Sequence, residues 1–337
     1  MVCKLSNSKA QALTDRELER LFSPRCPTGN LHDAALYALG LDLADPKMHG
    51  KRVRPILCIQ TCELLGGDAR AAIPFAMAIE LMHNFCLVHD DIEDGDTFRR
   101  DRPSVWVKYG LPHAINVGDY LLTKVFVALT CARRFGLDDD RAFRLTALIA
   151  ETLDETHIGQ ALDMNARRGR DFSVQDYLRI VESKTGRYLA APILGGAIVA
   201  DAPDSLLRRI ENFGKFLGPL FQIIDDIIDL TDGKGRETVG SDIREGKRSY
   251  LVAFTAAKCT QKEKARLFDI LDKPRARTTR KDVEEIAALY EKYGAIAAGR
   301  DYCRKLLNRG RRALQHAPEP LRNYLLETFE GLIERKR

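Results

Sequence analysis

The sequence lacks several features that would assign a protein to a class at once. Its longest weakly polar run, YLAAPILGGAIVA at residues 188–200, is shorter than the roughly 20 residues that a membrane-spanning helix needs. The N-terminal segment MVCKLSNSKAQALTDRELERLF is too polar for a signal peptide. The sequence therefore predicts a cytoplasmic protein without a transmembrane segment.

A large excess of charge of one sign is also missing. Lys and Arg number 53 against 48 Asp and Glu, which gives a formal net charge of +5. This balance argues against a protein that binds nucleic acid, although local basic clusters can still hold phosphate. The sequence contains no G-x-x-x-x-G-K-[ST] loop, which argues against P-loop nucleotide chemistry.

The eight cysteines lack the spacing of a zinc site. Only Cys58 and Cys62 are close in sequence, and neither has a His or Cys partner at zinc-like spacing. We expect reduced thiols, as in cytosolic proteins.

Strand-like alternation of polar and apolar residues is scarce, whereas helical periodicity dominates. Residues 70–92, 142–164 and 205–230 carry apolar residues at intervals of three and four, over lengths well beyond a strand. Breaks rich in Gly, Pro, Asp or basic residues separate such segments. The pattern predicts one all-α domain, residues 1–337, in which long helices surround a central apolar cavity.

Two acidic motifs share the spacing D-D-x-x-D. DDIED at residues 90–94 and DDIID at residues 225–229 each follow an apolar helical run. Residues four apart on a helix lie on one face, about 6 Å from each other. Mg²⁺ is usually held by one or two such carboxylates together with substrate phosphates. One motif alone could be an acidic helix end in solvent, but two copies after apolar runs favour metal binding.

Basic residues lie close to both acidic motifs. HGKRVRP supplies Lys51, Arg52 and Arg54, RRDRP follows the first motif, and Lys184 and Lys247 lie in ESKTGR and REGKR. Basic residues of this kind are often solvated surface charges. In combination with two metal motifs, they indicate recognition of a diphosphate.

The chain resembles the trans-isoprenyl diphosphate synthase (polyprenyl synthetase) family. The resemblance covers about residues 45 to 255 and rests on eight segments in order, GKRVRP, LVHDDIED, RRDRP, VGDYLL, GQALD, KTG, FQIIDDIID and GSDIREGK. It implies an isoprenoid-synthase-type bundle that condenses isopentenyl diphosphate head to tail with dimethylallyl, geranyl or farnesyl diphosphate. It also implies three Mg²⁺ ions per active site, with Mn²⁺ as an alternative, and a homodimer.

The resemblance assigns site residues by motif match. The metal ligands would be Asp90, Asp91, Asp94, Asp225, Asp226 and Asp229. Isopentenyl diphosphate would be bound by Lys51, Arg54, His83 and Arg100. The allylic diphosphate and the cation formed from it would lie near Arg99, Lys184, Thr185, Gln222 and Lys247. Without the resemblance, His83 would be interpreted as a core histidine.

The sequence departs from the family pattern at several positions. Asp101 stands where the family usually has Gly, and Trp106 where it has His; we expect an altered loop rather than altered chemistry. Glu237 stands where the family often has a lysine of the allylic site. Arg236 and Lys234 are the candidate substitutes for that lysine.

The length of the product would depend on side chains below the first aspartate, because one isoprene unit is about as long as one helical turn, roughly 5 Å. Met82, Phe85 and Cys86 occupy these positions, and Phe85 is the candidate floor of the tunnel. An aromatic residue there resembles archaeal geranylgeranyl (C20) diphosphate synthases. Farnesyl diphosphate (C15), a longer polyprenyl chain, or plain packing of Phe85 are the alternatives.

Two other functions fit part of the pattern. A class I terpene cyclase shares the all-α fold and one D-D-x-x-D motif, but it has no need for an isopentenyl site. A non-catalytic subunit of a heteromeric prenyl synthase would be expected to lack one acidic motif, and both motifs are intact here.

Overall fold

The structure, a computed structural model, describes residues 5–23, 28–45, 49–231 and 239–333. Its elements fall into two compact units, which are Met1–Glu151 with Ala191–Arg208 and Thr152–Ala190 with Arg209–Arg337. We refer to them as unit 1 and unit 2. The prediction of a single domain is not tested by this division and stays a prediction.

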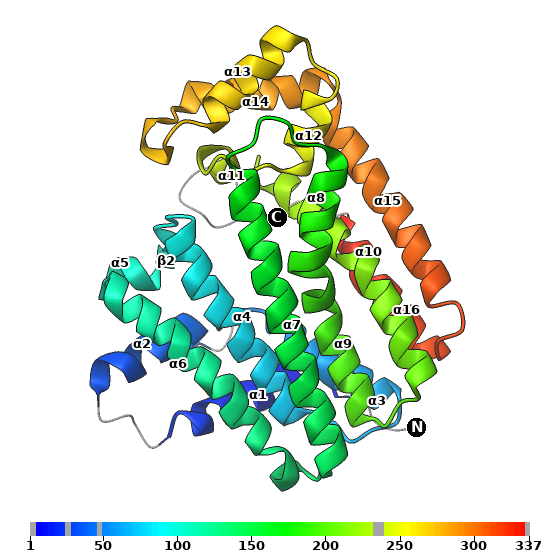
Figure 1. Ribbon diagram of the computed structural model, residues 1–337. Helices are drawn as coiled ribbons and strands as arrows, with labels where there is room; N and C mark the ends of the chain where they lie inside the picture. The colour runs from blue at the N-terminus through cyan, green and yellow to red at the C-terminus, as the bar shows by residue number, and fades with distance from the viewer. Residues whose placement is uncertain (1–4, 24–27, 46–48, 232–238, 334–337) are drawn as a thin grey trace. The chain divides into compact units, whose positions relative to one another are not determined.

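Unit 1 contains the N-terminal helices and the only strand pair among the described residues (Figure 1). Its elements are α1 (Asn7–Leu21), α2 (Gly29–Leu39), α3 (Val53–Leu64), α4 (Ile73–Glu93), β1 (Phe98–Arg99), β2 (Arg102–Pro103), α5 (Val105–Tyr109), α6 (Leu111–Thr130) and the 3₁₀ turn η2 (Ala132–Phe135). The unit boundaries fall inside α7 (Asp139–Ala166), α9 (Arg187–Val199) and α10 (Asp204–Ile228).

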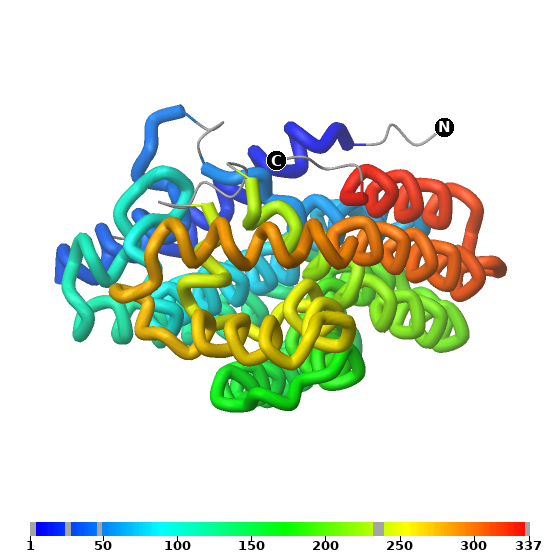
Figure 2. The backbone as a smooth tube through the Cα atoms, turned by 90° about the horizontal axis from the view of Figure 1, so that it is seen from above, coloured from blue at the N-terminus to red at the C-terminus, as the bar shows by residue number. Residues whose placement is uncertain are grey.

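Unit 2 contains the remaining elements. They are α8 (Val174–Val181), the π-helical turn η3 (Glu182–Gly186), α11 (Ser241–Arg244), α12 (Tyr250–Ala256), α13 (Gln261–Leu271), the 3₁₀ turn η4 (Arg275–Arg277), α14 (Arg280–Lys292), α15 (Ala295–Ala313) and α16 (Glu319–Ile333). The helices α15 and α16 lie side by side at the C-terminal end of the described chain (Figure 2).

Helix α4 carries the first acidic motif and is the most buried helix of unit 1. Every residue from Ile73 to Met82 is buried, as expected for a helix that is apolar all round. It packs along α6 (Figure 1). The two backbones approach closely near the motif, since a Cβ atom on Gly118 of α6 would lie 2.1 Å from Nε2 of His89. Gly118 therefore lets α6 support the end of α4.

The observed elements confirm the all-α prediction. The helices end at the expected breaks, for example after Leu39, Ala166 and Leu271. The strand pair is an exception that the sequence did not indicate. None of the described helices is both long and apolar enough to cross a membrane. The central apolar cavity stays a prediction.

Candidate active site

The first acidic motif lies in the last turn of α4. Asp90 and Asp94 are half-buried, and Asp91 is only 3% exposed. The last turn contains no basic residue, although the C-terminal end of a helix carries partial negative charge and disfavours carboxylates. Several carboxylates at this helix end therefore add to its negative charge, and nearby cations are needed to offset it.

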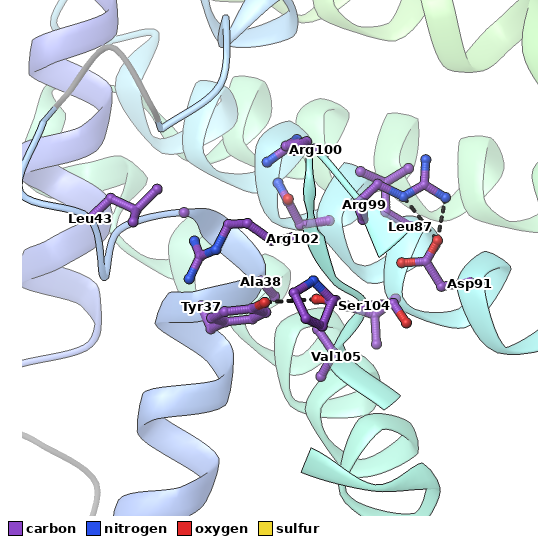
Figure 3. Close-up of a pocket in the computed structure, with 14 residues that line it drawn as sticks. Tyr37, Ala38, Leu43, Leu87, Asp91, Arg99, Arg100, Arg102, Ser104 and Val105 are labelled. Atoms are coloured by element: carbon purple, nitrogen blue, oxygen red, sulfur yellow. Dashed lines mark hydrogen bonds and ion pairs between the residues drawn. The ribbon is translucent and has the colours of Figure 1, made fainter. Parts of the chain in front are cut away.

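Arg99 of β1 supplies one of these cations from within unit 1. Its Nε donates to Oδ1 of Asp91 over 2.9 Å, and its Nη2 pairs with the same carboxylate (Figure 3). Asp96 lies 3.7 Å from Arg99. Arg99 remains 26% exposed at its side chain, so its guanidinium is held in place while part of it faces solvent. Its expected contact with an allylic diphosphate stays a prediction.

Arg100 lies in a tight turn between β1 and β2. The strands pair antiparallel, and both turn residues, Arg100 and Asp101, have positive φ angles of 54° and 60°. These are the signs of a type I′ hairpin, whose second central position usually takes Gly. The turn therefore adopts the left-handed conformation although Asp101 replaces Gly. Trp106, in place of His, donates its indole N–H to the main-chain oxygen of Asp96 over 2.8 Å.

The residues predicted to bind isopentenyl diphosphate gather in unit 1. The guanidinium of Arg100 lies against Gly50, next to the exposed Lys51. Burial, followed by the positive charges of Arg54 and Arg100, lowers the pKa of His83 well below its ordinary value. His83 is therefore neutral at physiological pH and lies within a cluster of guanidinium groups. The contact between Gly50 and Arg100 joins positions that are 50 residues apart in the sequence.

A cavity of about 50 Å³ lies between α2, α4 and the hairpin (Figure 3). Oδ1 of Asn84 and Oγ of Ser104 line it, are buried, and have no hydrogen-bond partner among the described residues. Buried polar atoms of this kind usually bind ordered water. Met82, Phe85 and Cys86 do not line this cavity.

The second acidic motif is more deeply buried than the first. Asp225 is half-buried, whereas Asp226 and Asp229 are each 2% exposed. Asp226 accepts hydrogen bonds from the hydroxyl of Tyr177 over 2.9 Å and from Nε2 of Gln222 over 3.1 Å. This contact fixes the amide of Gln222.

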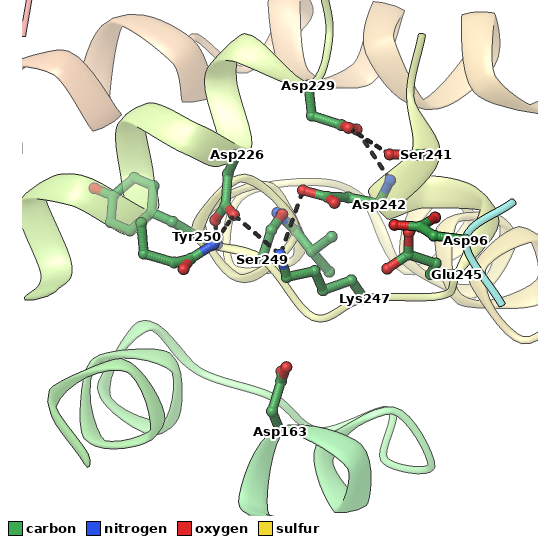
Figure 4. Close-up of polar contacts among 12 residues, drawn as sticks. Asp96, Asp163, Asp226, Asp229, Ser241, Asp242, Glu245, Lys247, Ser249 and Tyr250 are labelled. Carbon is green, nitrogen blue, oxygen red and sulfur yellow. Dashed lines mark hydrogen bonds and ion pairs between the residues drawn. The ribbon is translucent and has the colours of Figure 1, made fainter. Parts of the chain in front are cut away.

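Asp229 connects the second motif to α11 (Figure 4). It accepts a hydrogen bond from Oγ of Ser241 over 2.7 Å and another from the main-chain N–H of Asp242 over 3.0 Å. Its carboxylate therefore fixes the start of α11. A role for Asp229 as a direct metal ligand stays a prediction.

Lys247 lies between two carboxylates of unit 2 (Figure 4). Its Nζ is 3.5 Å from Oδ2 of Asp242 and 3.7 Å from Oδ1 of Asp226. Burial lowers the pKa of Lys247, but the charges of Asp242 and Asp226 outweigh it and raise the pKa well above its ordinary value. Lys247 is a permanent cation beside the second motif.

Lys184 and Thr185 lie in the π-helical turn η3, a geometry that often marks functional sites. Two glycines allow this turn to pack closely within unit 2. A Cβ atom on Gly159 of α7 would lie 2.3 Å from the main-chain N of Lys184, and one on Gly218 of α10 would lie 2.7 Å from that of Gly186. Any larger side chain at either glycine would displace the turn.

Asp163 was not among the predicted site residues, although its motif GQALD was recognised. It is 6% exposed, and its carboxylate accepts from Nζ of Lys184 over 3.0 Å. Burial raises its pKa, but Lys184, Lys247 and Arg167 together lower it below the ordinary value. Its place in the motif, four residues before the basic Arg167, could have indicated an ionic role.

The half-buried carboxylates of each acidic motif, taken one unit at a time, suit Mg²⁺ in one particular mode. Among the described residues, no three carboxylate, histidine or cysteine side chains converge closely enough to bind a metal ion by themselves. The half-buried carboxylates of Asp90, Asp94 and Asp225 are nevertheless hard oxygen donors. Mg²⁺ held by one or two carboxylates is completed by water and substrate phosphate oxygens. Glu237, Arg236 and Lys234 lie outside the described residues.

The comparisons with known proteins agree on one family. The family model described as "Polyprenyl synthetase" matches residues 43–291. The geranylgeranyl diphosphate synthase of Saccharolobus solfataricus is 35% identical over 246 residues, which is 72% of this chain and 73% of that protein. The geranylgeranyl pyrophosphate synthase of Geoglobus acetivorans is 33% identical over an alignment that covers 99% of each chain.

A solved structure is similar over nearly the whole length. The crystal structure of geranylgeranyl pyrophosphate synthetase from Pyrococcus horikoshii Ot3 matches with a TM-score of 0.85 and 31% identity. The match covers 98% of both chains.

Proposed function

The chain belongs to the polyprenyl synthetase family, and we propose that it is a prenyltransferase that makes geranylgeranyl diphosphate from isopentenyl diphosphate and an allylic diphosphate. The observation that carries the proposal is that His83 lies among the charges of Arg54 and Arg100 in unit 1, with Lys51 next to Gly50, which Arg100 contacts. These residues are close in sequence to an acidic helix end. Cationic side chains can bind one diphosphate directly, and carboxylates can bind the other through metal ions. The combination therefore suits a reaction with two diphosphate substrates. The names of the curated relatives support this reaction and this product.

Asp90, Asp94 and Asp225 would hold Mg²⁺, with three ions per active site and Mn²⁺ as an alternative. Bound with substrate phosphate oxygens, the ions would neutralise the charge that develops on the departing diphosphate. Asp91 and Asp226 have strong protein partners. Along with Asp229, they would act mainly by orienting neighbouring groups, with water-mediated contact to the metal as their other role.

Arg99, Lys184 and Lys247 would bind the allylic diphosphate. Each of these cations is already held by a buried carboxylate. Arg99 forms an ion pair and hydrogen bonds with Asp91, and Lys184 forms an ion pair of 3.0 Å with Asp163. Lys247 lies 3.7 Å from Asp226 and 3.5 Å from Asp242. Such fixed charges need little reorganisation when negative charge develops on the leaving group.

Lys51, Arg54, His83 and Arg100 would bind isopentenyl diphosphate. The allylic carbon–oxygen bond breaks, and its electron pair leaves with the diphosphate. The double bond of isopentenyl diphosphate then forms the new carbon–carbon bond, and a proton passes from the resulting cation to the released diphosphate. Thr185 and Gln222 would contribute oxygen atoms that stabilise the allylic cation without a covalent bond. The reaction requires both diphosphate substrates to be bound at the same time, which is part of the proposal.

Met82, Phe85 and Cys86 would limit the length of the product. Phe85 is 3% exposed, and its ring packs edge-on against His89 with centroids 4.9 Å apart. A buried, fixed aromatic ring suits the floor of a tunnel. Farnesyl diphosphate and longer chains remain the alternatives.

A homodimer and a cytoplasmic location belong to the same proposal. Leu111, Ile115, Phe126 and Val127 of α6 are apolar and between 38% and 47% exposed. Exposed apolar residues can mark a protein interface, and a second copy of the chain would cover them. The six cysteines within the described residues are free thiols, which supports a reducing compartment.

The decisive experiment is incubation with Mg²⁺, isopentenyl diphosphate and, in turn, dimethylallyl, geranyl or farnesyl diphosphate. We expect loss of both substrates, release of diphosphate and a C20 alcohol on chromatography after dephosphorylation. A cyclic hydrocarbon from the allylic substrate alone would indicate a terpene cyclase. No turnover at all would favour a non-catalytic subunit. A monomer in light scattering would contradict the homodimer.

A further inference from the structure

The sequence G-K-R occurs once in each unit, at Gly50–Arg52 and at Gly246–Arg248. Each copy contains one of the two lysines expected to bind diphosphate, Lys51 for isopentenyl diphosphate and Lys247 for the allylic substrate. Each copy also lies just before a helix, since α3 begins at Val53 and α12 at Tyr250. The two copies come from unrelated parts of the chain and can be compared contact by contact.

The arginine of the first copy is completely buried and uses all three of its nitrogen positions. Nε of Arg52 donates to Oδ1 of Asp15 over 2.7 Å, Nη1 to Oε1 of Glu80 over 2.9 Å, and Nη2 to the main-chain oxygen of Leu39 over 2.8 Å. These partners come from α1, α4 and α2. The side chain of Arg52 is 0% exposed, so it joins three helices and cannot reach a substrate.

The arginine of the second copy repeats this arrangement with different partners. Nε of Arg248 donates to the oxygen of Gly169 over 3.1 Å, Nη1 to the oxygen of Gly246 over 2.9 Å, and Nη2 to Oδ1 of Asp272 over 2.6 Å. Its side chain is also 0% exposed. Asp272 follows α13, and Gly169 follows α7.

The glycines on the other side of each lysine are also constrained. Gly50 and Gly246 have φ angles of +91° and +71°, a region that L residues rarely adopt. A Cβ atom on Gly246 would lie 2.3 Å from the main-chain oxygen of Leu271. Each lysine is thus flanked by a glycine in a special conformation and by an arginine with three fixed hydrogen bonds. Because peptide groups are planar, these two neighbours together fix the backbone at the lysine and therefore the direction in which its Cα–Cβ bond leaves the chain.

We propose that Arg52 and Arg248 are positioning residues that aim Lys51 and Lys247 at the two diphosphate groups. The inference rests on the proposed function, because that function assigns a different substrate to each lysine. It adds two residues that contact no substrate, and it predicts that each of them affects the binding of only one substrate. Loss of the first anchor should affect isopentenyl diphosphate, and loss of the second should affect the allylic diphosphate.

The test uses Arg52→Lys and Arg248→Lys, which keep the charge and lose the forked geometry of the guanidinium. Steady-state kinetics would be measured with each substrate varied in turn. Arg52→Lys should raise KM for isopentenyl diphosphate by about 10-fold to 100-fold, the scale of effect produced by a displacement of about 1 Å. Arg248→Lys should raise KM for the allylic diphosphate similarly. In each variant, KM for the other substrate should stay within about twofold of the wild type.

Arg141→Lys is the matched control. Arg141 donates to Oδ2 of Asp138 over 2.8 Å and to the main-chain oxygen of Val199 over 2.9 Å, but no predicted site lysine is next to it in sequence. This change should leave both KM values unaltered. If the arginine variants do not fold, Glu80→Gln and Asp272→Asn weaken one contact of each anchor and should shift the same KM values in the same directions.

The outcomes separate the two proposals. A wild type without condensation activity overturns the proposed function and this inference with it. An active wild type whose variants raise both KM values equally, or lower only the thermal midpoint, overturns the positioning role alone. An increase in KM for isopentenyl diphosphate alone in Arg52→Lys, and for the allylic diphosphate alone in Arg248→Lys, supports it.

Discussion

The two acidic motifs have the same D-D-x-x-D spacing but different surroundings. In the first, two of the three aspartates are half-buried, and one, Asp91, is held by Arg99. In the second, only Asp225 is half-buried, while Asp226 and Asp229 are buried with several protein donors. Equal spacing therefore does not imply equal roles. If both motifs bind metal as proposed, the first offers more half-buried carboxylates, and the second also holds α11 in place through Asp229.

The largest expected difference concerns catalysis. Asp90→Asn should lower kcat by about 10²–10³-fold, the typical effect of removing one group that stabilises developing charge. It should not lower the thermal midpoint, because a carboxylate at the C-terminal end of a helix is unfavourable there. Turnover assays with saturating Mg²⁺ and thermal unfolding would measure both quantities.

Glu93→Gln is the matched control for Asp90→Asn. It removes the same charge from the same helix end, at an exposed residue that is not a predicted ligand. Its activity should stay close to that of the wild type. Equal losses of activity in both variants would indicate a general charge effect and contradict the assignment of Asp90.

The second difference concerns the residue five positions before each motif, which is Phe85 on α4 and Leu220 on α10. Phe85→Ala should lengthen the product by one or more isoprene units, because a turn of about 5 Å opens below the first aspartate. Leu220→Val, also in a buried position, should leave the product unchanged. Chromatography of dephosphorylated products distinguishes them, and an unchanged pattern for Phe85→Ala would remove Phe85 from the chain-length role.

The third difference concerns stability. Asp229→Asn should lower the free energy of unfolding by about 1–3 kcal/mol, because the amide keeps only one acceptor oxygen and no charge for the two donors Ser241 Oγ and the N–H of Asp242. Asp94→Asn in the first motif should have a smaller effect on stability, because its carboxylate is half-buried whereas Asp229 is 2% exposed. Denaturant unfolding without Mg²⁺ would compare the two. A stable Asp229→Asn variant would show that the contacts to α11 contribute little.

The smallest expected effect concerns pH. His83 lies seven residues before the first motif, and its lowered pKa means that the folded protein binds a proton there more weakly than the unfolded chain does. The contribution of His83 to stability should be constant above pH of about 6.5 and decrease as pH falls below it. The position seven residues before the second motif is Gly218, which cannot titrate.

Thermal midpoints without ligand would be compared between pH 5.5 and 7.5 for the wild type and His83→Gln. The wild type should lose stability relative to the variant at the acidic end, by about 1 kcal/mol per pH unit at most. Parallel profiles would indicate that His83 is not held neutral.

Much of the fold could be predicted because its signals are local. Helical periodicity and Gly- or Pro-rich breaks depend on neighbouring residues, and they located α4, α7 and α10 correctly. The carboxylate pairs of the two motifs also follow from helix geometry alone. The β1–β2 hairpin was not predicted, since its turn residues are Arg100 and Asp101 rather than the usual Asn-Gly.

The partners of the site residues could not be predicted, because they are distant in sequence. Lys51 and Arg52 are adjacent cations, yet Lys51 is exposed and Arg52 is buried against Asp15 and Glu80. Those carboxylates are 37 and 28 residues away. Similarly, Asp163 is 21 residues from Lys184. Which cation is available to a ligand depends on tertiary packing.

The π-helical turn η3 has a consequence for how this region of the chain tolerates length changes. A π turn carries one residue more than the regular helix around it, which is equivalent to about 100° of rotation about the axis. The side chains of α8 and those of Arg187–Ala190 therefore have different phases around a nearly continuous helix. Deletion of one residue within Glu182–Gly186 would restore a regular helix. The side chain at the position of Lys184 would then turn away from Asp163. Substitutions in this segment change one group, whereas a single deletion changes the orientation of every group that follows.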